Sequence, residues 1–274
     1  MKLLDFYGVL NEVAPKTLSD EFCARYGAYD NSGILIDTGC PVDKALFSLE
    51  FSAAAVAKAI ETGANVIVTH HPAIYGKISE IRDDAFSPLG KKLLACIRNG
   101  ISVISMHLNL DGAVGGIDES LMRAVQISAA KASGLPQPSD EQAVSEPLQG
   151  GGYGRAYTVA QTQLSALCKA LKAELGTERL WAYANNGAPV QRAASFCGAG
   201  GDEKALAFAC EQGASVVISS DFRHHVLAMA ADLGVSVIAL THYASENYGF
   251  EKYYEKIGRK VDIPCEYHVD ENLL

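Results

Sequence analysis

The chain contains two copies of one pattern, an apolar run followed by a histidine and, four positions later, an acidic residue. The run 234–240 leads to His242 and Glu246, and the similar run 100–106 leads to His107 and Asp111. A short apolar run closed by polar residues predicts a buried strand, and open α/β sheets place their sites at the carboxyl ends of such strands. If a helix begins there, residues four apart project from one face. The pattern therefore indicates strands that end in metal-ligand side chains.

A second repeat supports a duplicated architecture. The run 63–68 resembles the run 213–218, and each leads into a segment that contains paired histidines. We therefore predict an α/β protein with two pseudo-symmetric α/β halves packed around a dinuclear metal site, and with a small middle α/β unit. The predicted parts are 1–132 as the first half, 133–190 as linker and middle unit, and 191–274 as the second half.

Turn-forming residues set the predicted boundaries. The segment 133–154 contains three prolines and a run of three glycines, which predicts a linker. The last helix is expected over 249–257, after the polar stretch that holds His242. The glycines at 198–201 favour a tight turn into a helix over a cradle for phosphate.

Composition excludes several classes of protein. The net charge of −9 and the pI near 5.3 disfavour a surface that neutralises nucleic-acid phosphates. There is no apolar stretch long enough for a bilayer span and no convincing signal peptide, so we expect no membrane association. The seven cysteines show no C-x-x-C spacing, which predicts reduced thiols and a cytoplasmic location.

Three histidines and two acidic residues form the candidate metal site. Neutral imidazole binds several first-row divalent ions, and a carboxylate can bridge two of them, so this set suits a pair of ions such as Zn, Fe or Mn with positions open for water. Taken singly, each residue could instead cap a strand or begin a helix. The proposed ligands are His70, His71, Asp111, His242 and Glu246.

Two further histidines are candidates for catalysis. His107 and His225 occupy similar positions after predicted strands, so each could be a general acid or base, a partner of a ligand, a substrate contact or an ordinary polar contact. His224 and His268 are expected to be surface or capping residues.

Several motifs together resemble one known family. They are Asp30 to Gly33, Thr69 to Pro72, His107 to Asp111, Gly198 to Gly201, Asp221 to His225 and His242 to Glu246. In this order they resemble the dinuclear-metal-centre family of GTP cyclohydrolase 1 type 2 homologues, also called Ngg-interacting-factor-three-like proteins. The resemblance covers nearly the whole chain. The sequence departs from the family pattern at residues 48–51, at Leu108 and at Ser219-Ser220, none of which is a proposed ligand.

The resemblance implies more than the residues alone do. It implies the same five ligands, with Glu246 bridging the ions, and a toroidal homohexamer. It also implies a metal-dependent hydrolase that uses activated water on a nucleotide-like or phosphate-bearing small molecule. Opening of the GTP imidazole ring follows from the family label, and the same ligands would suit a phosphoester or an amide. The alternative is a non-enzymatic metal-handling or scaffolding ring.

Overall fold

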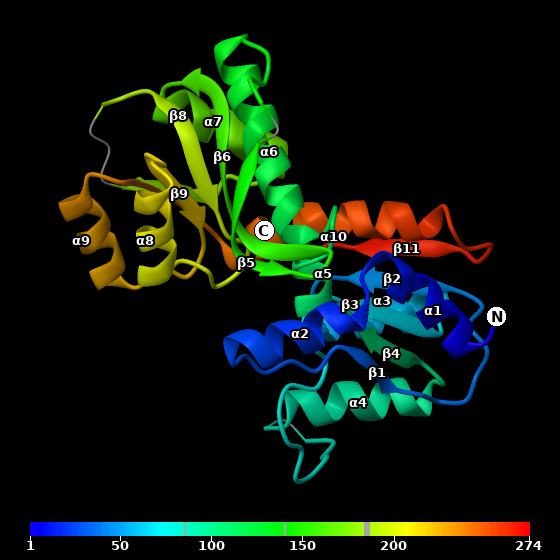
Figure 1. Ribbon diagram of the computed structural model, residues 1–274. Coiled ribbons are helices and arrows are strands. Elements are labelled where there is room, and N and C mark those ends of the chain that lie inside the picture. The colour runs from blue at the N-terminus through cyan, green and yellow to red at the C-terminus, as the bar shows by residue number, and fades with distance from the viewer. Residues whose placement is uncertain (85, 140, 184–186) are drawn as a thin grey trace. The chain divides into compact units, whose positions relative to one another are not determined.

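The computed structural model describes residues 1–274 except 85, 140 and 184–186. The described residues form two compact units (Figure 1). Unit 1 comprises Met1–Ala113 and Phe250–Asn272, and unit 2 comprises Val114–Gly249 and Leu273–Leu274. Each unit contains one sheet with helices packed on it, which confirms the mixed α/β class. The predicted boundaries at residues 132 and 190 stay a prediction.

The sheet of unit 1 has five strands in the order β1-β4-β3-β2-β11. The strands β2, β3, β4 and β11 are parallel neighbours, whereas β1 pairs antiparallel with β4 at one edge. Strands β2, β3 and β4 are buried throughout, as expected for a parallel sheet covered on both faces. The strands are β1 (Gly33–Ile36), β2 (Ala45–Ser48), β3 (Val66–Thr69), β4 (Ser102–Ser105) and β11 (Cys265–His268).

Helices α3 and α4 contribute to one apolar core of unit 1, where Val56 and Leu93 pack with Ile67 and Val103 of the sheet. The side chain of Ser52 accepts a hydrogen bond from the Ala55 amide and so caps α3. Aromatic rings form a second packing layer, in which Phe47 of β2 contacts Phe250. The helices are α1 (Leu3–Val13), α2 (Lys16–Tyr26), α3 (Ala53–Thr62), α4 (Pro88–Arg98) and α5 (Leu108–Asp111).

The sheet of unit 2 has six strands in the order β5-β6-β8-β9-β10-β7. Helices α8 and α9 cover one face around a core that contains Leu206 and Val226, and α6 packs on β6 and α7 (Figure 1). The strands are β5 (Gln142–Leu148), β6 (Gly151–Thr162), β7 (Leu180–Tyr183), β8 (Val190–Ser195), β9 (Val216–Ser219) and β10 (Ser236–Leu240). The helices are α6 (Ile117–Ser133), α7 (Leu164–Leu175), α8 (Glu203–Glu211), α9 (His224–Leu233) and α10 (His242–Gly258), the last counted with unit 2 as far as Gly249.

Four strands of each sheet share one arrangement, which confirms the predicted pseudo-symmetry. In unit 1 three parallel strands, β2, β3 and β4, are followed at the edge by antiparallel β1. In unit 2 the parallel strands β8, β9 and β10 are followed by antiparallel β7. The repeated sequence runs correspond to β3 with β9 and to β4 with β10.

Two predictions about local structure were wrong, and one strand was missed. The linker expected over 133–154 instead contains the end of α6, the strand β5 and the start of β6. Its glycines and prolines belong to a β-hairpin, with Gly150 in the turn and Pro147 on the edge strand β5, and this composition is also typical of linkers. The last helix begins at His242 rather than at residue 249. Strand β11 was not expected, because its residues are mostly polar and only half-buried.

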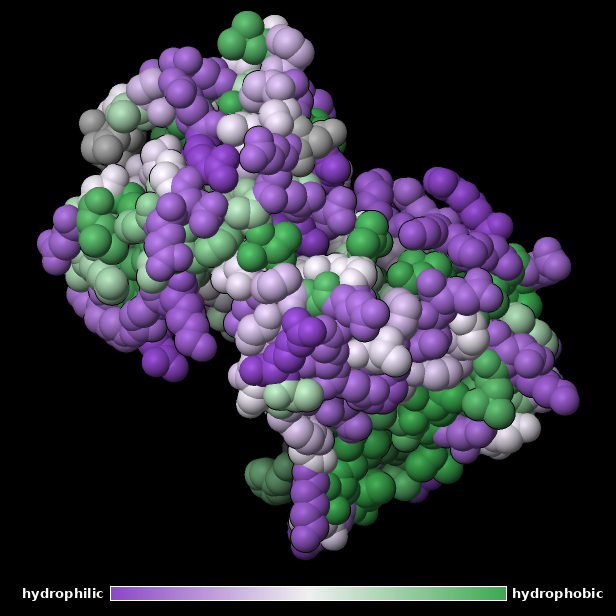
Figure 2. All heavy atoms as spheres, in the orientation of Figure 1, coloured by the Kyte–Doolittle hydropathy of each residue, from purple (hydrophilic) through white to green (hydrophobic). Residues whose placement is uncertain are grey.

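The surface of unit 1 carries a hydrophobic patch near α4 (Figure 2). It surrounds a groove of about 550 Å³ whose apolar lining is Leu35, Ile36, Ile74, Ile78, Ile81, Leu93 and Ile97. Among the described residues, no helix has the length and hydrophobicity of a membrane span. The seven cysteines, all in the described part of the chain, are thiols rather than disulfides, as predicted.

Candidate functional site

His70 and His71 lie at the carboxyl end of β3 in unit 1. Their backbone amides donate to the carbonyl of Leu49, which continues the pairing of β3 with β2 beyond the strand end. The His70 ring is fully buried, and its Nδ1 donates to the carbonyl of Met106 over 2.8 Å. Because a carbonyl only accepts, Nδ1 carries the proton and Nε2 keeps its lone pair. The tautomer of His70 is therefore the one that can bind a metal through Nε2.

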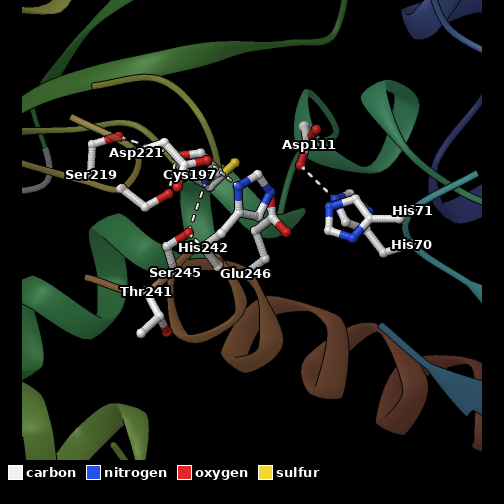
Figure 3. Close-up of polar contacts among 12 residues, drawn as sticks. His70, His71, Asp111, Cys197, Ser219, Asp221, Thr241, His242, Ser245 and Glu246 are labelled. Atoms are coloured by element: carbon white, nitrogen blue, oxygen red, sulfur yellow. Dashed lines mark hydrogen bonds and ion pairs between the residues drawn. The ribbon is translucent and has the colours of Figure 1, made fainter. Parts of the chain in front are cut away.

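Two other histidines of unit 1, His71 and His107, are also held through Nδ1, in their case by carboxylates. Nδ1 of His71 lies 2.7 Å from Oε1 of Glu50, and Nδ1 of His107 lies 2.8 Å from Oδ1 of Asp30. Asp111, in the short helix α5, has Oδ1 3.5 Å from Nε2 of His70 (Figure 3). Unit 1 therefore brings together every residue of the first half that the sequence predicted for the site.

The carboxylate of Asp30 anchors His107 and is itself enclosed by donors. The hydroxyls of Ser19 and Ser32 each donate to Oδ2 of Asp30, and its side chain is only 1% exposed. Burial alone raises the pKa of Asp30, but the hydrogen bonds from His107, Ser19 and Ser32 outweigh burial and hold this pKa well below its ordinary value. Asp30 is therefore ionised at neutral pH.

We expect the Asp30→Asn variant to have a lower free energy of unfolding than the wild type at neutral pH, with both proteins kept in a chelator. Because the folded-state pKa is depressed, the stabilisation by ionised Asp30 is fully present above the unfolded-state pKa of about 4 and is lost as the pH falls toward the folded-state value. Urea unfolding of both proteins between about pH 7 and about pH 3 measures this difference. A stability difference that is the same at every pH would contradict the expected role of the carboxylate.

In unit 2, His242 and Glu246 occupy the first turns of α10. Nε2 of His242 lies 3.1 Å from Oε1 of Glu246, so the four-residue spacing brings the two together as predicted. Nδ1 of His242 lies 2.6 Å from Oδ2 of Asp221 (Figure 3). Asp221 has the left-handed backbone conformation, with φ 55°, which is uncommon for a residue other than glycine. The turn after β9 thus adopts an unfavourable conformation at the residue that anchors His242.

The glycine-rich loop after β8 passes close to this pair. A Cβ atom at Gly198 would collide with Oε1 of Glu246 and stand 3.3 Å from Nε2 of His242, and the φ of Gly198 is +57°. The Gly198 amide donates to Ser245 Oγ, and its carbonyl accepts from Ser220 Oγ. The backbone of Gly198 is therefore committed to contacts within the protein, which agrees with a tight turn rather than a phosphate cradle.

His225 does not share this environment. It lies at the start of α9 with its side chain 58% exposed, and its Nε2 is 2.6 Å from Oε1 of Glu203. The neighbouring His224 is also exposed, as expected for a surface residue. His225 is thus a surface ion-pair partner of Glu203. The ring of His242 instead contacts Asp221 and Glu246.

The donor set fits divalent metal ions. Nδ1 of each of His70, His71, His107 and His242 meets an oxygen acceptor, so each ring presents Nε2. Carbonyl and carboxylate partners of this kind orient metal-binding histidines and raise their basicity. A structural histidine needs no such uniform arrangement, so the chemistry of these side chains favours ligation.

A family model confirms the relationship that the motifs indicated. The model described as Duf34/NIF3 (NGG1p interacting factor 3) matches residues 1–270. The chain belongs to the Duf34/NIF3 family. A Clostridium perfringens protein named GTP cyclohydrolase 1 type 2 homolog is 27% identical over 278 residues, which cover 98% of this chain and 96% of that protein.

Solved structures show the same NIF3 fold. The Staphylococcus aureus hypothetical protein SA1388 matches with a TM-score of 0.77 and 23% identity, over 98% of this chain and 96% of that one. A Bacillus cereus protein related to NIF3 matches with a TM-score of 0.75 and 20% identity, over 97% of this chain and 96% of that one. At these identities the likeness shows the fold alone.

Sequence reasoning about this NIF3-family chain missed the anchors of the histidines. Glu50, Asp30 and Asp221 were not predicted to serve the site, although Asp30 and Asp221 lie in motifs that carried the family resemblance. The acceptor for His70 is a backbone carbonyl, for which a sequence holds no signal. The close approach of Gly198 to Glu246 was also missed, since a glycine run is equally typical of a turn.

Proposed function

We propose that this chain is a metal-dependent hydrolase that holds two divalent ions and acts on a nucleotide-like or phosphate-bearing small molecule. The observation that supports it best is the common anchoring of Nδ1 in His70, His71, His107 and His242, which assigns the proton of each ring to Nδ1 and the lone pair to Nε2. The naming of its relatives as GTP cyclohydrolase 1 type 2 homologs agrees with this reaction class.

The proposed ligands are the five residues predicted from the sequence. Their donor atoms are imidazole nitrogens and carboxylate oxygens, a mixed set that Zn, Fe and Mn all accept. When bound, such ions supply Lewis-acid activation of water near neutral pH. The residues that would hold the ions are His70, His71, Asp111, His242 and Glu246, and the family resemblance implies that the buried carboxylate of Glu246 would bridge them.

The proton-transfer role is better supported for His107 than for His225. Asp30 fixes Nδ1–H of His107, so Nε2 can accept a proton, and the ring centroid lies 5.1 Å from that of His70. The buried, ionised Asp30 also stabilises the imidazolium that forms when His107 takes up the proton. His225 is highly exposed and pairs with Glu203, so a catalytic role for it would need that pair to open.

The toroidal homohexamer implied by the family resemblance and the cytoplasmic location predicted from the cysteines belong to the same proposal. Unoxidised thiols at all seven cysteines agree with a reducing compartment. Light scattering of the purified chain measures its mass, and a monomer at physiological concentration would contradict the ring.

Turnover with defined metals tests the proposed function. The chain, reconstituted with Zn, Mn or Fe in turn, is incubated with nucleotides, phosphoesters and dipeptides, beside the double variant His70→Ala, His71→Ala. We expect hydrolysis of at least one phosphate-bearing compound, and a fall of at least about 100-fold in kcat/KM in the variant. Activity that survives the double change belongs to another site. Metal binding without turnover of any compound would favour a metal-handling protein.

A further inference from the structure

The geometry of unit 1 points to a second use of His107. We propose that unit 1 holds one divalent ion by itself, on the Nε2 atoms of His70, His71 and His107, before both ions of the proposed centre are bound. The inference rests on the proposed function only in that His70 and His71 are taken as metal ligands. It adds a ligand, His107, and a singly loaded state.

The spacing of the three rings suits one tetrahedral ion. Each ring offers one ligand nitrogen, and these atoms all lie within 4.8 Å of one another. Three nitrogens at about 2.0–2.1 Å from a tetrahedral zinc stand about 3.3 Å apart. The ring centroids are 4.8 Å apart for His70 and His71, 5.1 Å for His70 and His107, and 5.8 Å for His71 and His107. The three rings therefore already form a cluster and need only small movements to bind one ion.

The tautomers agree with this assignment. The Met106 carbonyl, Glu50 and Asp30 accept from Nδ1 of His70, His71 and His107, so all three lone pairs are on Nε2. The three anchors are in unit 1, as are the three rings. Three neutral imidazoles form a donor set that also occurs in catalytic zinc sites, with a fourth position left for water.

Asp111 does not serve this ion. Its Oδ1 lies 3.5 Å from Nε2 of His70, but among the described residues it does not join the group formed by His70, His71 and His107. His107 and Asp111 are therefore alternative partners of His70. If Asp111 were the partner of His70 in the fully loaded centre, Nε2 of His107 would be left to act as a base, so one side chain would serve both loading and proton transfer.

Cobalt binding to variants that lack the unit 2 ligands tests the inference. The background variant is His242→Ala, Glu246→Gln in the full chain, titrated with Co²⁺ and followed by visible absorption and by metal analysis after desalting. We expect it to keep half of the wild-type Co²⁺ content. Adding His107→Ala should weaken Co²⁺ binding at least about tenfold, whereas adding His224→Ala should leave it unchanged. Thermal unfolding of every variant identifies any that fails to fold.

The outcomes separate the two proposals. Loss of all Co²⁺ in the folded background variant, with full binding by the wild type, would overturn the three-histidine site and leave the proposed function standing. Retention of Co²⁺ after His107→Ala would overturn it too. A wild type that binds no Co²⁺, Zn, Mn or Fe would end both proposals.

Discussion

Replacing Asp118 by asparagine is expected to lower the free energy of unfolding by about 3–5 kcal/mol. Asp118 of α6 is fully buried and forms an ion pair with Arg155 of β6, whose side chain is 3% exposed. Its carboxylate also accepts from the amides of Gly154 and Cys197, at 3.0 and 3.2 Å. The substitution leaves the buried guanidinium of Arg155 without a counter-charge. Removing one partner of a buried ion pair in this way destabilises a protein more than replacing both partners by apolar residues.

Urea unfolding measures the loss, and an exposed pair in the same unit is the control. Lys131 is 64% exposed and pairs with Glu174, so Lys131→Gln should cost no more than about 1 kcal/mol. Replacing both members of the buried pair by apolar residues, as in Asp118→Leu, Arg155→Met, should recover part of the stability. Equal small losses in Asp118→Asn and Lys131→Gln would show that the buried pair is not important for stability.

Gly198→Ala is expected to remove most of the bound metal while leaving the fold intact. The new methyl group would collide with Oε1 of Glu246, so this carboxylate must leave its place beside His242. The left-handed backbone of Gly198 adds strain of about 1–2 kcal/mol. Under the proposed function, displacement of Glu246 deprives the ions of their bridge.

Gly213→Ala is the control that separates the effect of backbone strain from the effect of displacing the Glu246 carboxylate. Gly213 has nearly the same φ, +66°, but an added Cβ would have nothing within 4 Å. Both variants should therefore lose similar stability from the backbone, and only Gly198→Ala should lose metal. Elemental analysis after reconstitution with Zn, together with thermal unfolding, checks both expectations. Wild-type metal content in Gly198→Ala would show that Glu246 is not needed to hold the ions.

Local patterns predicted the strands because burial leaves a direct trace in the sequence. The apolar runs became β3, β4, β9 and β10, and the polar residues after them lie at the strand ends. The pairing of His242 with Glu246 could be predicted because residues four apart on a helix lie close together on one face. Composition misled where polar or turn-forming residues occupy an edge, as in β5 and β11.

The anchoring of the histidines could not be predicted in the same way. Asp30 lies 77 residues before His107, and Glu50 and Asp221 each lie 21 residues before their histidines. No local periodicity links such pairs, because the chain brings them together only through the order of strands in each sheet. The candidate ligands were thus predictable from the sequence, but the residues that orient them were not.

The oxygen partners of the imidazoles also bear on how tightly this protein can compete for scarce ions. A ring that rotates freely must give up that freedom when a cation arrives, and the loss subtracts from affinity. The rings of His70, His71 and His242 are already immobilised through Nδ1, so most of that entropy is lost during folding rather than at capture. Under the proposed function, a chelator is therefore expected to remove the ions and to leave the side chains in nearly the positions that they have with metal bound.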